Sequence, residues 1–137
     1  RRASAKATMG RFQIEAAIQS VHAVRARSGQ TDWRALSKLH AGLNSLYPTI
    51  GGAVSQAAVV GRDAGPGAGL DMLARIDPAA IATYQPAWAV RADLLRRAGR
   101  LSEAREAYDK AISLCTDAPL RRWLEARVAS LPHHYRQ

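Results

Sequence analysis

Seven residues between positions 88 and 111 constrain the fold more than any other feature of the chain. They are Trp88, Ala92, Leu95, Gly99, Ala104, Tyr108 and Ala111. Steps of three and four residues place the first three on one helical face and the last three on the face of a second helix, with Gly99 at the turn between them. The alanines allow the two backbones to approach closely, while Trp88 and Tyr108 fill the space around them. Such a pair cannot bury its own apolar stripe, so we expect further helical hairpins beside it.

The same spacing resembles one unit of the tetratricopeptide repeat (TPR), in which two antiparallel helices pack through small and aromatic side chains. These residue types form a packing pattern and contribute no reactive group. The pattern therefore favours a scaffold that binds proteins over a catalyst.

The rest of the chain also has helical periodicity, interrupted by Gly, Pro and Asp. We expect Asp32 to cap a helix, Pro66 to lie in the first turn of another, and residues 61–67 to form the clearest loop. The predicted helices cover residues 5–27, 32–47, 50–61, 66–76, 87–98, 102–115 and about 117–131, with a turn at 79–84. No alternating strand pattern is present. The fold class is therefore all-α, a TPR-like stack of about three helical hairpins plus a C-terminal capping helix. It forms a single domain over residues 1–137, with a frayed tail at 132–137.

Composition agrees with this fold class and indicates the cellular location of the protein. The 137 residues are 47% hydrophobic, which is enough for one domain with its own core. A single cysteine, Cys115, excludes an internal disulfide, and no apolar run approaches the ~20 residues of a membrane span. We expect a cytoplasmic domain without membrane contact. The sequence starts without Met, which predicts a fragment of a longer protein.

The sequence contains no motif for catalysis or for binding a cofactor. The glycine-rich run at 61–69 lacks the Lys-Ser/Thr ending of a phosphate-binding loop, and no strand precedes it. The four histidines, His22, His40, His133 and His134, lack metal-ligand spacing, and we expect the first two to pack between helices. Cys115 continues an apolar stripe and is expected to be a buried thiol. We predict no enzyme activity, cofactor, metal or small-molecule substrate.

The net charge of +9 leaves two interpretations open. It favours an acidic partner, or it reflects an ordinary soluble surface rich in arginine. A nucleic-acid surface is one version of the first interpretation, because basic side chains cluster on one hairpin and along the first helix. They are Arg91, Arg96, Arg97, Arg100 and Arg105, and Arg1, Arg2, Lys6, Arg11, Arg25 and Arg27. Few aromatic side chains remain to stack on bases, and no helix-turn-helix module is evident.

Several segments, in order, resemble one bacterial family. They are residues 10–23 (GRFQIEAAIQSVHA), 31–33 (TDW), 46–48 (LYP), 65–70 (GPGAGL), 91–100 (RADLLRRAGR) and 121–124 (RRWL). Together they are similar to the C-terminal TPR-like extension of extracytoplasmic-function (ECF) RNA polymerase sigma factors, over roughly residues 10–131. Residues 49–59 depart from the pattern of that family, as do Arg91 and Thr116.

The resemblance implies a non-catalytic accessory domain that modulates transcription initiation through protein–protein or interdomain contacts. Its implied partners are the sigma regions of the parent chain, RNA polymerase, or both, with promoter DNA bound only by regions upstream of this chain. Two other functions stay open: a free-standing TPR-type adaptor that binds peptides, and a basic nucleic-acid-binding module.

Two sets of residues are candidates for interaction. Asp93, Arg96 and Arg97 point away from the packed stripe of their helix, toward the side that lines the groove of a TPR stack. Their alternative role is a solvated face with an Asp93–Arg97 ion pair.

The second set is Phe12, Gln13 and Glu15, an aromatic beside an acid near the start of the first helix. Such a cluster predicts a docking point between domains. The alternative is that Phe12 covers the core and Glu15 offsets the helix dipole.

Overall fold

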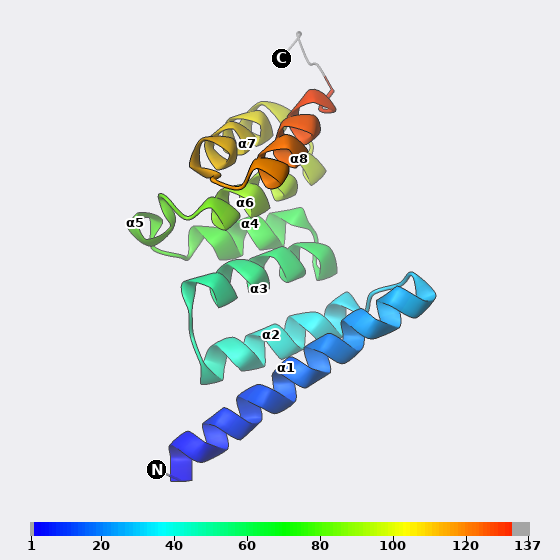
Figure 1. Cartoon of the computed structure of the whole chain (residues 1–137), viewed down its shortest axis with the longest axis vertical. Coiled ribbons are helices and arrows are strands. Elements are labelled where there is room, and N and C mark those ends of the chain that lie inside the picture. Colours follow the sequence, from blue (N-terminus) through cyan, green and yellow to red (C-terminus); the bar gives the residue numbers. More distant parts are fainter. Residues whose placement is uncertain (1, 133–137) are drawn as a thin grey trace.

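The chain folds into helices joined by short turns (Figure 1). The computed structural model describes residues 2–132, and within them the side chains of 10–25 and 29–132. The helices are α1 (Arg2–Ser28), α2 (Trp33–Leu46), α3 (Ile50–Asp63), α4 (Pro66–Ala74), α5 (Pro78–Ile81), α6 (Gln85–Arg97), α7 (Leu101–Leu114) and α8 (Ala118–Ala129). No strand occurs in residues 2–132, so the all-α prediction is confirmed. The predicted frayed tail lies outside the described residues except for Pro132.

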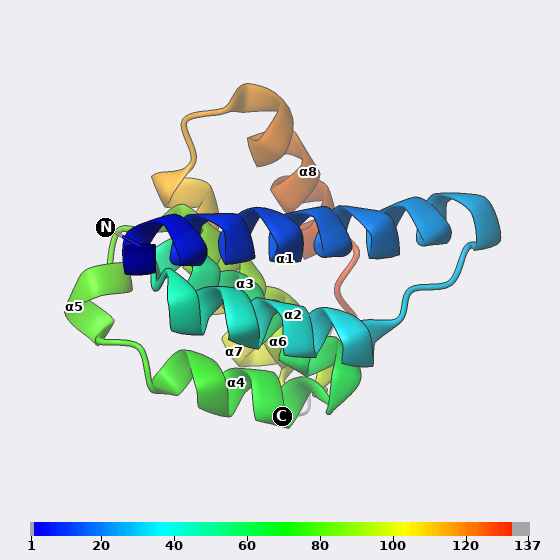
Figure 2. The same cartoon turned by 90° about the horizontal axis from the view of Figure 1, so that it is seen from below.

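The helices form a stack of hairpins along the long axis of the molecule. The hairpins are α1–α2, α3–α4 and α6–α7, and α8 packs on α7 at the C-terminal end (Figure 1). Contacts between successive hairpins run from α2 to α3 and from α3 and α4 to α6. Figure 2 shows the same stack from below, with α1 lying across it and longer than the helices behind it. This arrangement is consistent with the predicted stack, and its TPR-like character stays a prediction.

Local sequence explains where the helices begin and end. The carboxylate of Asp32 accepts a hydrogen bond from the backbone N–H of Ala35 at 3.0 Å, which confirms it as an N-cap. Pro66 occupies the first turn of α4, as predicted, where its missing N–H costs no helical hydrogen bond. Gly99 has a φ of +80°, the left-handed conformation that allows a tight turn from α6 into α7.

The strongest sequence pattern belongs to the largest cluster of buried side chains among the described residues. Tyr108 is 1% exposed, and Ala92, Ala104 and Ala111 are fully buried around it. Trp88 packs against the same cluster, and its indole N–H donates to the carbonyl of Ala82 at 3.0 Å. The predicted contact of both aromatics with one shared core is confirmed.

The loop predicted at residues 61–67 is shorter than expected. Helix α3 continues to Asp63, and Gly61 and Gly69 are buried helical residues. A Cβ on Gly69 would lie 2.8 Å from the carbonyl oxygen of Ala57 and 2.9 Å from the Cα of Gly61. These glycines therefore allow α3 and α4 to touch, and glycine content alone did not distinguish close packing from a loop. Among the neighbouring glycines, Gly65 has the turn conformation, with a φ of +101°.

Three smaller expectations had different outcomes. The turn predicted at 79–84 contains the short helix α5, whose Ile81 is buried. Cys115 is a buried thiol, as predicted. His40 is half-buried, but His22 is exposed, so the prediction that both histidines pack between helices is wrong for His22.

Candidate groove between the helical hairpins

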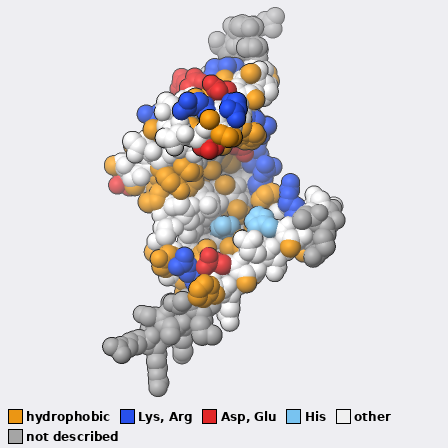
Figure 3. All heavy atoms as spheres, viewed as in Figure 1, with side chains coloured by type: hydrophobic (Ala, Val, Ile, Leu, Met, Phe, Trp, Pro, Cys, Tyr) orange, Lys and Arg blue, Asp and Glu red, His pale blue; other side chains and the backbone are white. Residues whose placement is uncertain are grey.

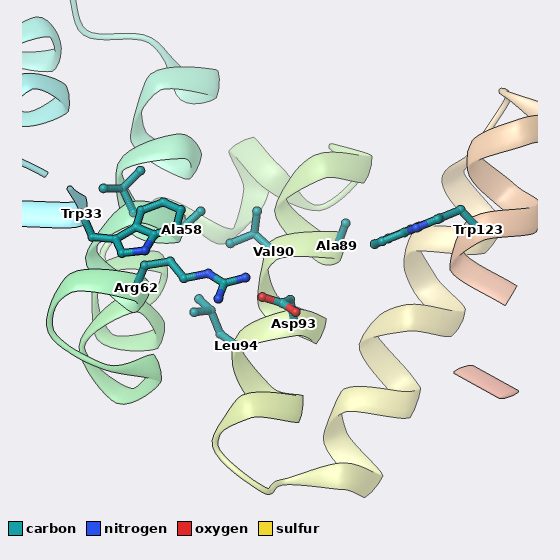
Figure 4. A pocket seen from close by; sticks show the side chains of 9 residues that line it. Trp33, Ala58, Arg62, Ala89, Val90, Asp93, Leu94 and Trp123 are labelled. Atoms are coloured by element: carbon teal, nitrogen blue, oxygen red, sulfur yellow. The ribbon is translucent and has the colours of Figure 1, made fainter. Parts of the chain in front are cut away.

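An apolar groove runs across one side of the stack and draws side chains from four helices. Its volume is about 280 Å³ (Figure 4). It is lined by Trp33 from α2, by Ala58, Val59 and Arg62 from α3, by Ala89, Val90, Asp93 and Leu94 from α6, and by Trp123 from α8. In the space-filling view, the face between α2 and the upper helices is hollowed, and Lys and Arg side chains lie along its margin (Figure 3). The groove therefore exists only where successive hairpins meet.

Two tryptophans stand at opposite ends of the groove (Figure 4). Trp33 is the first residue of α2 and is half-buried, while Trp123 on α8 is 54% exposed. Each ring has an arginine over it: Arg62 lies 5.4 Å from the Trp33 ring centroid, and Arg127 lies 5.0 Å from that of Trp123. These are cation–π distances. Both ends of the groove thus combine a large aromatic surface with a positive charge.

Small side chains leave the space above the floor of the groove unfilled. Ala58 and Ala89 leave room between α3 and α6, while Leu94, which is 1% exposed, closes the bottom. Trp123 faces outward because it adjoins Leu124, which is fully buried, and successive helical residues point about 100° apart.

One acidic side chain among the described lining residues, Asp93, is surrounded by arginines. Its Oδ1 lies 2.7 Å from Nη2 of Arg96 and 3.9 Å from Nη2 of Arg127, and its Oδ2 lies 4.0 Å from Nη1 of Arg97. Nη2 of Arg97 also donates to the carbonyl oxygen of Gly61 at 2.9 Å, which ties α6 to α3. The carboxylate therefore links α6 to α8 at the edge of the groove, and Arg97 links α6 to α3.

The charges of these arginines are stable. The hydrogen bond from Arg96 to Asp93 raises the pKa of Arg96. Partial burial, followed by the like charge of Arg62, lowers the pKa of Arg97. Arginine titrates so far above neutral pH that both side chains stay positively charged.

The structure brings together one of the two predicted residue sets. Asp93 lines the groove, and Arg96 and Arg97 contact its carboxylate, with Arg96 closer than the Arg97 partner expected from the sequence. Sequence reasoning missed Trp33, Arg62, Trp123 and Arg127. The segments 31–33 and 121–124 carried a family signal, but no periodicity relates helices so far apart in the chain.

The second set lies elsewhere, on α1 at the end of the stack opposite α8 (Figure 1). Phe12 is 66% exposed and Gln13 is also exposed, so the alternative that Phe12 covers the core is wrong. Glu15 pairs with Nε of Arg11 at 3.1 Å, and Arg11 lies 3.8 Å from the ring centroid of Tyr47. These residues form an exposed surface, and its role in docking stays a prediction.

The described part of the chain, residues 2–132, contains neither a candidate membrane-spanning helix nor a candidate cluster of metal ligands. No helix there has the length and apolar character needed to cross a membrane. Within the same part of the chain, no three or more His, Cys, Asp or Glu side chains are grouped closely enough to hold a metal ion.

Comparison with known proteins gives one informative similarity. The chain is 37% identical over 109 residues to an uncharacterized protein of Rhizobium meliloti (strain 1021). The matched stretch is 80% of this chain but 26% of that relative, so the chain spans about a quarter of its length. No protein-family model and no solved structure matches the chain.

Proposed function

We propose that this chain is a non-catalytic, protein-binding accessory domain of an ECF sigma factor. It modulates transcription initiation in the cytoplasm through contacts with the sigma regions of its own polypeptide, with RNA polymerase, or with both. The groove between Trp33 and Trp123 is the observation that carries the protein-binding part of the proposal.

The chemistry of the groove supports recognition of a protein. Tryptophan and arginine are enriched among the residues that dominate binding energy at protein interfaces. The groove volume of about 280 Å³ lies at the lower edge of the ~300–1,000 Å³ typical of small-molecule sites. A site of this size accommodates one or two side chains of a partner.

The transcriptional part of the proposal is supported by the ordered resemblance over residues 10–131. Two segments of that resemblance, 31–33 and 121–124, supply the tryptophans of the groove. The surface around Phe12 is a second candidate contact, because a large exposed aromatic on an uncovered helix suits interdomain docking.

The first test is the gene that encodes this chain. Sigma-type helices encoded upstream support an ECF sigma factor, whereas a start codon close to Arg1 supports a free-standing peptide-binding adaptor instead. The second test is transcription by polymerase reconstituted with the complete protein, compared with a Trp33→Ala/Trp123→Ala variant. We expect transcript yield to change by about fivefold, since truncating a dominant interface residue costs more than ~1 kcal/mol.

Arg122→Ala is the matched control, because Arg122 is exposed on α8 but does not line the groove. Equal transcription by all three proteins would refute a role for the groove. Binding of the isolated chain to DNA or RNA that weakens steeply with salt would instead support the nucleic-acid alternative.

A further inference from the structure

The geometry points to the chemical class of the partner: the groove binds an acidic peptide segment with one or two large apolar side chains at its centre. This inference rests on the proposed protein-binding function and specifies the ligand of the same site. It makes Trp33, Trp123, Arg62 and Arg127 the residues that determine specificity.

The apolar part of the inference follows from the walls and floor of the groove. The indoles of Trp33 and Trp123 flank a floor of small aliphatic side chains (Figure 4). Trp123 is 54% exposed although it lies beside apolar surface, so a ligand side chain that covers it removes apolar area from water. Aromatic and branched aliphatic side chains bury the most area in such a space.

The acidic part follows from the balance of charges around the groove. Three arginines, Arg96, Arg97 and Arg127, lie within 4.0 Å of the carboxylate of Asp93. A fourth arginine, Arg62, lines the same groove. Asp93 offsets one of these positive charges and leaves a local excess of three. The Nε atoms of Arg96 and Arg127 are also buried and have no hydrogen-bond partner among the described residues.

The position of Asp93 shows what this cluster accepts. One carboxylate is already held by a charge-assisted hydrogen bond of 2.7 Å, a geometry that a Glu or Asp of a ligand can reproduce. Arg62 and Arg127 are the arginines stacked on the two tryptophans, so carboxylates placed on either side of the central apolar residue would meet a guanidinium. The overall charge of +9 would speed the encounter with such a segment.

A single-stranded nucleic acid fits the groove less well. Stacking platforms for bases lie along a positive track that follows the phosphate backbone. Here the floor between the tryptophans is aliphatic and offers no aromatic platform for a row of stacked bases.

The inference is tested by NMR titration of the complete 137-residue chain with blocked synthetic peptides. The probe is Asp-Glu-Asp-Phe-Leu-Asp-Glu-Asp. One matched peptide replaces every acid with Lys, and another replaces Phe and Leu with Ser. The third comparison is a single-stranded oligonucleotide of eight thymidines. The indole N–H signals report the site, because Trp33 and Trp123 line the groove, whereas Trp88 does not line it and its indole N–H donates to the carbonyl of Ala82.

We expect the acidic apolar peptide to shift the Trp33 and Trp123 signals and leave that of Trp88 unchanged. Its affinity should exceed that of each matched peptide by about tenfold, and Arg62→Glu should weaken it by a similar factor. Arg122→Glu is the charge-matched control and should retain the affinity of the unaltered chain.

Three results would overturn the inference: equal binding of acidic and basic peptides, shifts that spare both groove tryptophans, or tighter binding of the oligonucleotide. If the acidic peptide fails while polymerase or sigma regions still shift the same two indoles, the groove binds protein of another chemistry. In that case the proposed function stands and this inference falls.

Discussion

The helical pairs α6–α7 and α1–α2 share one architecture but bury very different amounts of their side chains. In α6–α7 the buried residues are Ala87, Ala92, Leu94, Leu95, Ala104, Ala107, Tyr108 and Ala111. Among the described side chains of α1 and α2, the buried residues are Ile18 and Leu36. The difference follows from neighbours, because α6–α7 is flanked by α3, α4 and α8, whereas α1–α2 meets the stack through α3. In such a stack the interfaces with neighbouring hairpins contribute to the stability of each hairpin, so the pair with more neighbours is the more strongly stabilised.

The largest expected effect contrasts one aromatic from each pair. Tyr108→Ala should lower the free energy of unfolding by about 3–5 kcal/mol, since it leaves a cavity in the largest cluster of buried side chains. Phe12→Ala removes a side chain that is 66% exposed and should change it by less than about 0.5 kcal/mol. Urea denaturation of the two variants measures both values. Similar losses would show that burial does not separate the two pairs.

A second contrast tests the close packing of α3 on α4, which connects the two regions. Gly69→Ala should cost about 1–3 kcal/mol, because the new Cβ meets the backbone of Ala57 and Gly61. Gly67→Ala, two residues earlier in the same helix, meets nothing within 4 Å and should be neutral or stabilising by up to about 1 kcal/mol. Thermal melts of both variants measure this difference in stability. Equal melting temperatures would show that the close contact of α3 with α4 does not require glycine at position 69.

A smaller effect, on pH, should appear in the loosely covered pair. Partial burial, followed by the charge of His22, lowers the pKa of His40 from its ordinary 6.5. The unfolded chain then binds a proton more readily than the folded one. The free energy of unfolding is therefore highest above pH ~6.5, where His40 is neutral in both states. It decreases as the pH falls toward the lowered pKa of the folded chain.

Melting temperatures of the chain and of His40→Gln at about pH 8 and about pH 5.5 measure this effect. The His40→Gln variant should lose less stability on acidification. A His22→Gln control should keep most of the dependence, because burial is the larger cause of the shift. Identical pH profiles of His40→Gln and the unaltered chain would contradict the assignment.

The smallest expected effect on stability belongs to the groove. Trp123→Ala should change the free energy of unfolding by no more than about 0.5 kcal/mol, since the side chain is 54% exposed. The adjacent Leu124→Ala should cost about 2–5 kcal/mol because Leu124 is fully buried. Chemical denaturation of the two variants compares neighbouring residues with opposite roles. A large loss for Trp123→Ala would make that tryptophan a structural residue.

The sequence predicted most of the helices because their signals are local. Apolar residues at three- and four-residue steps, the cap at Asp32 and the proline at Pro66 each act within one or two turns of helix. The run 61–67 was the exception, since glycine serves a loop and a close helix contact equally well. The exposure of Phe12 could not be predicted from local sequence, because it depends on whether another helix covers that side of α1.

By itself, the sequence determined an all-α chain, the helical pair around Trp88 and Tyr108, and the side of α6 on which Asp93, Arg96 and Arg97 lie. These features depend on spacing within single helices or neighbouring ones. Only the tertiary structure decided that Trp33 and Trp123 share one groove and that Arg127 reaches Asp93. The residues of that groove belong to four helices, and their distances depend on how each hairpin packs on the next, which no local pattern records.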